Sequence, residues 1–145
     1  MQNENTLEQS LALTFAAAWH HLESRLDQNL GAIRGISLAE YRLLNALGNA
    51  PGSQASRVDL AQAVGLTPSG VTRALRPMEK LGIVSTLKSK RDARLSIAAM
   101  TPAGRELLND ASAVVDDAMK NIIKRTPKVA GQLNELIELL QEFER

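Results

Sequence analysis

The sequence contains no cysteine, so the chain can form no disulfide bond, no thiolate metal site and no thiol redox switch. Aromatic residues make up only 3% of it, and aliphatic side chains must therefore supply most of the core. No apolar run approaches the roughly 20 residues that a membrane-spanning helix needs. The opening stretch MQNENTLEQS also lacks the basic and apolar segments of a secretory signal. We therefore expect a cytoplasmic protein with no membrane partner.

What the sequence does contain is an uneven distribution of charge. Its 145 residues are enough for one domain with its own core, and its net charge is only +1. Residues 57–105, however, hold nine Arg or Lys against three acids, a net charge of +6, whereas the rest holds eight against thirteen. A basic middle between acidic arms is typical of a site for a polyanion. Chance clustering of solvated charges is the alternative.

Two capping boxes predict the first two helices: Thr6 with Gln9, and Ser37 with Glu40. Apolar residues recur at helical spacing after the first box, and we expect that helix to stop at Gly31. The second helix is expected to close near Gly48. The stretch NAPGSQAS after it has the composition of a turn.

Three Thr-Pro pairs predict three further helix starts: Thr67-Pro68, Thr101-Pro102 and Thr126-Pro127. Each places a hydroxyl at the N-cap, where it accepts from an unpaired backbone N–H, and a proline at the first helical position, where no N–H is needed. The last two helices carry coiled-coil-like apolar seams. Further apolar residues beside the seams make these faces wider than a single partner helix would need.

A helix-turn-helix is predicted over residues 56–81, where a short helix capped by Ser56 ends at Gly65 and a second begins after Thr67. The inward residues are expected to be Val58, Leu60, Ala61 and Val64 on the first helix and Val71, Leu75 and Met78 on the second. The opposite face of the second helix carries Ser69, Thr72, Arg73, Arg76 and Lys80. Small hydroxyls permit close approach to a major groove, and arginine can bond two acceptors of guanine. A solvated face would normally mix charges, yet Glu79 is the only acid on this helix.

The only strand signal is a hairpin in which IVSTLKS and ARLSIAA flank the polar turn SKRD. The cations near its tip are Lys88, Lys90, Arg91 and Arg94, beside the single acid Asp92. A basic hairpin directly after a helix-turn-helix is typical of a wing, which lays cations along phosphates or inserts one into a narrow minor groove. An edge hairpin charged to prevent aggregation is the alternative.

Taken together, LTPSGVTRALRPMEKLGIV, the hairpin with RDAR and the stretch AAMTPAGRELL resemble the MarR family of bacterial transcription regulators. The resemblance covers nearly the whole chain in element order and is most specific over residues 57–108. It implies a mainly α fold with a small β-hairpin wing (α+β), forming a single 1–145 domain. In that domain a winged-helix DNA-binding part over 37–100 is joined to a helical dimerisation part over 6–31 and 101–145.

The same resemblance implies double-stranded DNA as a partner, with the base-facing positions at Ser69, Thr72, Arg73 and Arg76. Asp92 and Arg94 match the family's Asp-x-Arg wing motif, in which the acid holds the arginine in position. The resemblance also implies a homodimer, more often a repressor than an activator, that binds a palindromic operator. Many members release DNA when a small phenolic or anionic effector binds, but the residues do not identify an effector for this chain. The segments around Trp19, His20, Arg34 and Tyr41 are candidates for lining such a crevice, and each of these residues also has an ordinary packing interpretation.

No catalytic constellation stands out, so we expect no enzyme activity and no cofactor. The neighbouring His20 and His21 would point about 100° apart on a helix and chelate an ion poorly. Ser53, Ser56 and Ser69 have no histidine near them in sequence, and no phosphate-binding glycine motif is present. A winged-helix module that binds a partner protein, without specific DNA binding, is the alternative function.

Pro77 falls inside the second helix of the helix-turn-helix, where it removes a hydrogen bond to the carbonyl of Arg73 and clashes with that turn. A helix that ended before Pro77 would separate Met78 and Leu81 from the apolar stripe that they continue. We therefore expect the helix to run to about Leu81 and to bend near residues 73–77.

Overall fold

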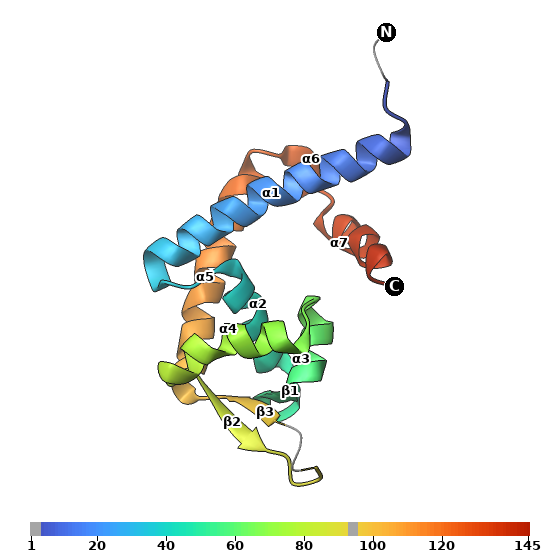
Figure 1. The fold of residues 1–145 in the computed structure, drawn as a ribbon. Coiled ribbons are helices and arrows are strands. Elements are labelled where there is room, and N and C mark those ends of the chain that lie inside the picture. The colour runs from blue at the N-terminus through green and yellow to red at the C-terminus, as the bar shows by residue number, and fades with distance from the viewer. Residues whose placement is uncertain (1–3, 93–95) are drawn as a thin grey trace.

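The computed structural model describes residues 4–92 and 96–145. Its helices are α1 (Leu7–Arg34), α2 (Leu38–Asn49), α3 (Arg57–Val64), α4 (Pro68–Lys80), α5 (Pro102–Lys124), α6 (Pro127–Ala130) and α7 (Leu133–Gln141), with 3-10 turns at Pro51–Ser53 and Glu142–Glu144. The strands are β1 (Gln54–Ser56), β2 (Val84–Lys88) and β3 (Ser96–Met100). In Figure 1 the three strands lie with α2, α3 and α4 at one end, and α5 connects them to α1, α6 and α7 at the other. The mainly α fold with a hairpin wing is confirmed.

The strands form one antiparallel sheet in the order β1-β3-β2. The hairpin pairs Val84 with Met100 at its base and Lys88 with Ser96 near its tip, as the alternation in the sequence predicted. The interpretation of NAPGSQAS as turn alone is wrong, because its last three residues form β1 and pair with β3. A strand of three residues is too short to show an alternating pattern, and its pairing with β3 is a long-range contact.

Most predicted helix starts are confirmed by their hydrogen bonds. Both capping boxes form, and the hydroxyls of Ser56, Thr67 and Thr101 each accept from the backbone N–H three residues later. The expected stop at Gly31 is wrong, because α1 continues to Arg34. Gly35 ends it instead, in the left-handed conformation (φ 68°), and its N–H bonds the carbonyls of Leu30 and Gly31. Two glycines lie four residues apart, and only the second takes the conformation that terminates a helix.

The helix start at Thr126 differs from the other two Thr-Pro sites. Its hydroxyl caps nothing, but donates to the carbonyls of Ile123 (3.1 Å) and Ile122 (3.4 Å) at the end of α5. The continuous helix expected after Thr126 is likewise wrong: α6 has four residues, and α7 begins after a break at Gly131 and Gln132. The threonine thus closes the preceding helix, which leaves α6 without a side-chain cap.

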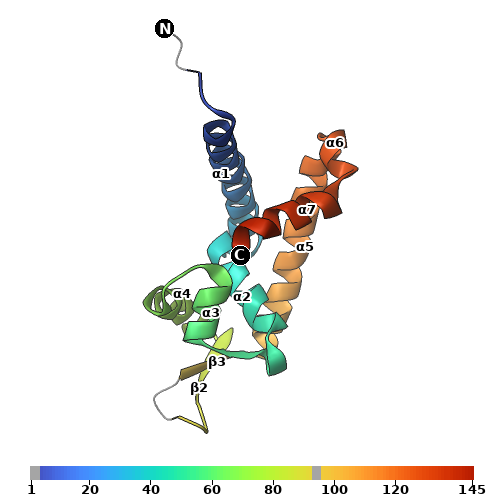
Figure 2. The same ribbon diagram turned by 90° about the vertical axis from the view of Figure 1, so that its right-hand side faces the viewer.

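The core is aliphatic, as the shortage of aromatic residues requires. Its largest fully buried side chains come from α1, α2, α3, α4 and β2: Leu30, Leu43, Leu44, Leu47, Leu60, Val71, Leu75, Met78 and Val84. Val58, expected to face inward, is instead 48% exposed, although Leu60, Ala61 and Val64 of the same helix are buried as predicted. Two apolar faces remain uncovered. One lies on the first half of α1, which includes Leu7, Leu11, Phe15 and Trp19, and the other on α7 and the turn after it. Figure 2 shows α7 crossing in front of the space between α1 and α5, and the rings of Phe15 and Phe143 lie 5.8 Å apart.

Candidate nucleic-acid interface

Helix α4 is fixed in orientation by its buried stripe. Val71, Leu75 and Met78 are at most 1% exposed, whereas Leu81, expected to continue the stripe, is 76% exposed. The opposite face is therefore turned to solvent, and Ser69, Arg73, Arg76 and Lys80 are all exposed on it. Because the two faces share one helix, burial of the stripe presents three cations and a hydroxyl outward together.

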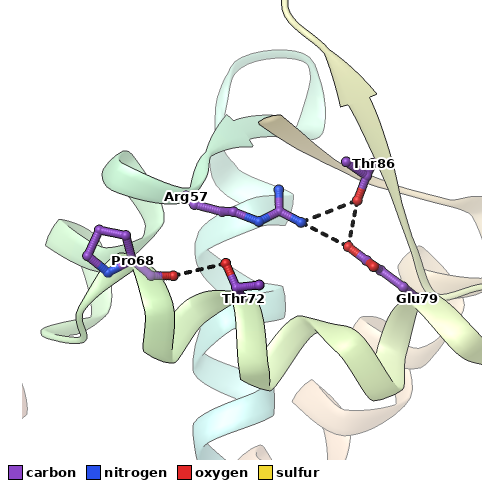
Figure 3. Close-up of polar contacts among 5 residues, drawn as sticks. All are labelled: Arg57, Pro68, Thr72, Glu79 and Thr86. Atoms are coloured by element: carbon purple, nitrogen blue, oxygen red, sulfur yellow. Dashed lines mark hydrogen bonds and ion pairs between the residues drawn. The ribbon is translucent and has the colours of Figure 1, made fainter. Parts of the chain in front are cut away.

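Thr72 occupies a more restricted place on that face. It is half-buried, and its hydroxyl donates to the carbonyl of Pro68 at 3.1 Å, as Figure 3 shows. The hydroxyl proton is therefore used within the helix. What Thr72 can offer a base is its methyl group, which suits the methyl of thymine, and a hydroxyl oxygen that can still accept.

Helix α4 passes through Pro77 without a break and ends at Lys80, with Leu81 as its C-cap. The expected extent of the helix is confirmed to within one residue. The N-terminal half, which carries Arg73, thus belongs to the same helix as the C-terminal turn that packs through Met78. The bend near residues 73–77 stays a prediction.

The wing presents its cations to solvent: Lys88, Lys90 and Arg91 are exposed, and Asp92 is half-buried. Arg94 lies outside the described residues. The hydroxyl of Ser89 accepts from the backbone N–H groups of Arg91 (3.2 Å) and Asp92 (3.4 Å), and so shapes the turn that carries the cations. This contribution of Ser89 was missed in the sequence, where its place in the stretch SKRD is the only signal.

An open groove of about 1230 Å³ lies between the wing and the start of α3. Its wall includes the cations Lys88, Lys90 and Arg91, together with Ser56 and Asp59. Cations and hydroxyls on a concave surface are the groups that most often contact phosphate and sugar oxygens.

The structure also joins three residues that the sequence did not connect. Glu79 accepts from Arg57 at 3.0 Å and from Thr86 at 2.5 Å, and Arg57 also donates to Thr86 at 3.3 Å (Figure 3). The only acid of α4 is therefore paired with a cation. Arg57 lies outside the α4–β2 segment, 22 positions before Glu79. No local sequence pattern reveals a pairing over that distance.

Arg34 and Tyr41, two of the residues considered for an effector crevice, have ordinary structural partners, whereas Trp19 is 43% exposed. Arg34 pairs with Asp110 at 3.3 Å, and the hydroxyl of Tyr41 lies 3.3 Å from that of Ser112. The rings of His20 and His21 are 5.9 Å apart and tilted by 59°. Within residues 4–92 and 96–145, no three metal-ligating side chains gather, and no helix there is long and apolar enough to cross a membrane.

The fold and this basic surface define a winged helix-turn-helix protein. A family model described as "MarR family" matches residues 34–95. An uncharacterised HTH-type transcriptional regulator of Bacillus subtilis, YdgJ, is 30% identical over 92 residues, covering 63% of this chain and 55% of the relative. The chain thus spans about half the length of that curated relative.

Solved structures match the chain over nearly its whole length. Sco3205 of Streptomyces coelicolor, a MarR family transcriptional regulator in complex with DNA, has 26% identity and a TM-score of 0.80, with 97% of this chain and 90% of that one covered. CouR of Rhodococcus jostii, bound to p-coumaroyl-CoA, has 23% identity and a TM-score of 0.79, with 97% and 96% covered. The chain is thus similar to MarR family proteins, in the family model over residues 34–95 and in the solved structures over nearly its whole length. The proteins of that family are transcription regulators and not enzymes.

Proposed function

We propose that the protein is a homodimeric transcriptional regulator that binds double-stranded DNA sequence-specifically through α4 and the wing. The observation that carries the proposal is the outward face of α4, where Arg73, Arg76 and Lys80 stand together beside a basic wing. The DNA complex of Sco3205, whose fold this chain shares, supports the same assignment.

Each element has a distinct role in this proposal. Helix α4 lies in the major groove, where Arg73 and Arg76 bond base edges or phosphates and Ser69 permits close approach. Lys88, Lys90 and Arg91 contribute affinity that depends on salt but not on sequence, because they neutralise phosphates and release counterions. Arg94, held by Asp92, reaches the minor groove as the family motif implies.

A homodimer follows from the uncovered apolar faces of α1 and α7. Exposed Leu7 (86%), Leu139 (64%) and Phe143 (67%) would be unfavourable in water, and two-fold dimers are the commonest way to cover such faces. Residues 6–31 and 101–145 would then form the dimerisation part, and 37–100 the DNA-binding part. Two helix-turn-helix units related by a two-fold axis predict a palindromic operator with half-sites about 34 Å apart.

Regulation in this proposal is steric repression: the dimer occupies a promoter palindrome and excludes the transcription machinery. A small-molecule effector would release it by changing the spacing of the two α4 helices. CouR holds p-coumaroyl-CoA within a fold of this type, which supports an effector but does not identify one for this chain.

The test begins with selection of binding sites from random duplex DNA by the full chain. A recovered palindrome gives the operator and the half-site spacing. In a mobility-shift assay, Arg73→Ala with Arg94→Ala should abolish or strongly weaken binding to that duplex. The matched control is Arg25→Ala with Arg125→Ala, which removes the same charge from exposed positions on α1 and after α5. Because both positions lie in the proposed dimerisation part, light scattering must give the control the same oligomeric state as the wild-type protein. Unchanged operator affinity in the first variant would refute the assignment.

The same experiment separates DNA binding from the alternative of a protein-interaction module. A module of that kind would yield no palindrome from the selection. It would also pass a heparin column without salt-dependent retention, despite the basic segment at residues 57–105.

A further inference from the structure

We propose that Arg57, Glu79 and Thr86 form a clamp that sets the position of the wing relative to α4. The inference rests on the proposed DNA binding, because a fixed wing matters only if α4 and the wing contact one duplex together. Arg57 begins α3, Glu79 lies in the last turn of α4, and Thr86 is the middle residue of β2. The clamp therefore ties together the three elements that meet behind the basic surface.

The geometry converges on one atom. Oε1 of Glu79 accepts from Nη2 of Arg57 at 3.0 Å and from the hydroxyl of Thr86 at 2.5 Å. The same Nη2 donates to the hydroxyl oxygen of Thr86 at 3.3 Å, which closes a three-membered ring of hydrogen bonds (Figure 3). Loss of any one member removes two of the three bonds.

The clamp lies close to the residues that would contact DNA. Arg76 precedes Glu79 by one turn of α4, and Lys88 follows Thr86 by two positions on the same side of β2. Helix and strand are joined only by residues 81–83, where Gly82 has a φ of 74°. The bond between Glu79 and Thr86 joins the residues before and after this short turn. It therefore restricts how far the wing can move relative to α4.

The pairing has the character of a positioning device more than of a stabilising one. The Arg57 side chain is 16% exposed and that of Glu79 is 32%. Across the described part of the chain, Nη1 of Arg57 is the one buried side-chain polar atom without a hydrogen-bond partner. A partly buried ion pair with an unsatisfied donor contributes little net stability, because desolvation offsets the attraction.

The direction in which one substitution changes DNA affinity separates this positioning role from simple electrostatics. Glu79→Ala removes a negative charge beside the DNA-facing surface, so electrostatics alone predicts tighter DNA binding. If Glu79 positions the wing, the same change should weaken binding to the selected palindromic duplex by about tenfold, because the carboxylate that accepts from Arg57 and Thr86 is lost. Asp59→Ala is the matched control: it removes an exposed acid in the first turn of α3 without touching the clamp, and binding should stay equal or tighten. Unchanged or tighter binding by Glu79→Ala would overturn the proposal.

A second pair of variants changes no charge. Thr86→Val removes the hydroxyl at an exposed strand position and keeps the side-chain shape, whereas Thr86→Ser keeps the hydroxyl. We expect weakened binding from the valine variant and near-normal binding from the serine variant, with both variants retaining the native thermal transition. Equal affinities for the two would contradict the clamp.

A measurement without DNA keeps the clamp testable if the proposed function fails. The absence of native cysteine allows Ser69→Cys and Lys90→Cys to carry a pair of spin labels on α4 and on the wing. The label-to-label distance distribution should broaden or shift when Glu79→Ala is added, because that change removes the acceptor of two clamp hydrogen bonds. An unchanged distribution would refute the clamp, whereas failure of the wild-type protein to bind any duplex would refute only the proposed function.

Discussion

Gly104, in the first turn of α5, lies directly against the backbone carbonyl oxygen of Ile83, so closely that a methyl group on Gly104 would overlap that oxygen. Thr101 binds the same turn, because its hydroxyl donates to the carbonyls of Ile83 (2.9 Å) and Gly82 (2.5 Å). The start of α5 therefore packs against the turn that connects α4 to the wing. A glycine is required here because no side chain fits between the helix and the turn.

We expect Gly104→Ala to destabilise the protein by about 1–3 kcal/mol, since the added methyl group must displace backbone atoms. The matched control is Gly31→Ala, which places the same methyl group in open space on α1. That variant should be more stable by about 0.5–1 kcal/mol, because alanine restricts the unfolded chain and favours helix. Urea unfolding measures the stability of both variants. Equal midpoints would show that the protein accommodates a methyl group at Gly104 without loss of stability.

How far the sequence predicts this fold depends on the range of the interaction. The cap at Thr67 and the stripe of Val71, Leu75 and Met78 involve residues three or four apart, so local pattern predicts them correctly. The hairpin also follows from local alternation. By contrast, strand β1 exists only through its pairing with β3, more than forty residues later, and three residues cannot show a period.

The same division applies to the candidate site. The exposed face with Arg73 and Arg76 is predictable, because burial of one helix face dictates the other. The pairing of Arg57 with Glu79 is not, since it depends on how α3 and α4 cross. Thr126 shows a further limit: its sequence matches that of the other Thr-Pro sites, but its hydroxyl bonds backward into α5. Thr67 and Thr101 have an extended backbone, whereas Thr126 has φ −131° and ψ 73°, a conformation that the local sequence does not reveal.

Removal of the wing cations and removal of the α4 arginines should affect DNA binding in different ways. Lys88→Ala with Lys90→Ala removes four lysines from each dimer, and should lower the slope of the logarithm of the DNA-binding constant against log salt concentration by about 3.6, at about 0.9 per lost phosphate contact. Discrimination between the selected palindrome and mixed-sequence DNA should hardly change. Fluorescence anisotropy over a range of salt concentrations gives both quantities, and an unchanged slope would mean that the two lysines do not contact phosphate.

Arg73→Ala should instead reduce discrimination. If Arg73 bonds a guanine through two donors, its loss costs about 1–3 kcal/mol in each half-site of the selected palindrome and little on mixed-sequence DNA. The comparison of the two duplexes at one salt concentration isolates this effect. Equal losses on both duplexes would reassign Arg73 to the phosphate backbone.

The proposed dimer predicts that charges on the uncovered apolar faces will separate the subunits. Leu7→Glu with Leu139→Glu, at side chains 86% and 64% exposed, should give a monomer by light scattering at micromolar concentration. Leu81→Glu is the control, because Leu81 is 76% exposed at the end of α4, away from both faces. A wild-type monomer would disprove the dimer itself, and a dimer that survives the double substitution would place its interface elsewhere.

Pro77 gives a final prediction, about the shape of α4, the helix whose outward face carries Arg73 and Arg76. Replacing this exposed proline with alanine restores an N–H that can bond the carbonyl of Arg73 and removes the clash with that turn. We expect Pro77→Ala to raise the free energy of unfolding by about 2 kcal/mol, the gain being reduced by the greater freedom of the unfolded chain. If α4 bends near residues 73–77, its segments before and after the bend should become more nearly coaxial in the variant. Amide residual dipolar couplings of α4, from Ser69 to Lys80, measure this change. Because Met78 anchors the C-terminal turn, the straightening would move the N-terminal half, and operator affinity should fall although stability rises. Identical couplings in the two proteins would show that α4 is already straight.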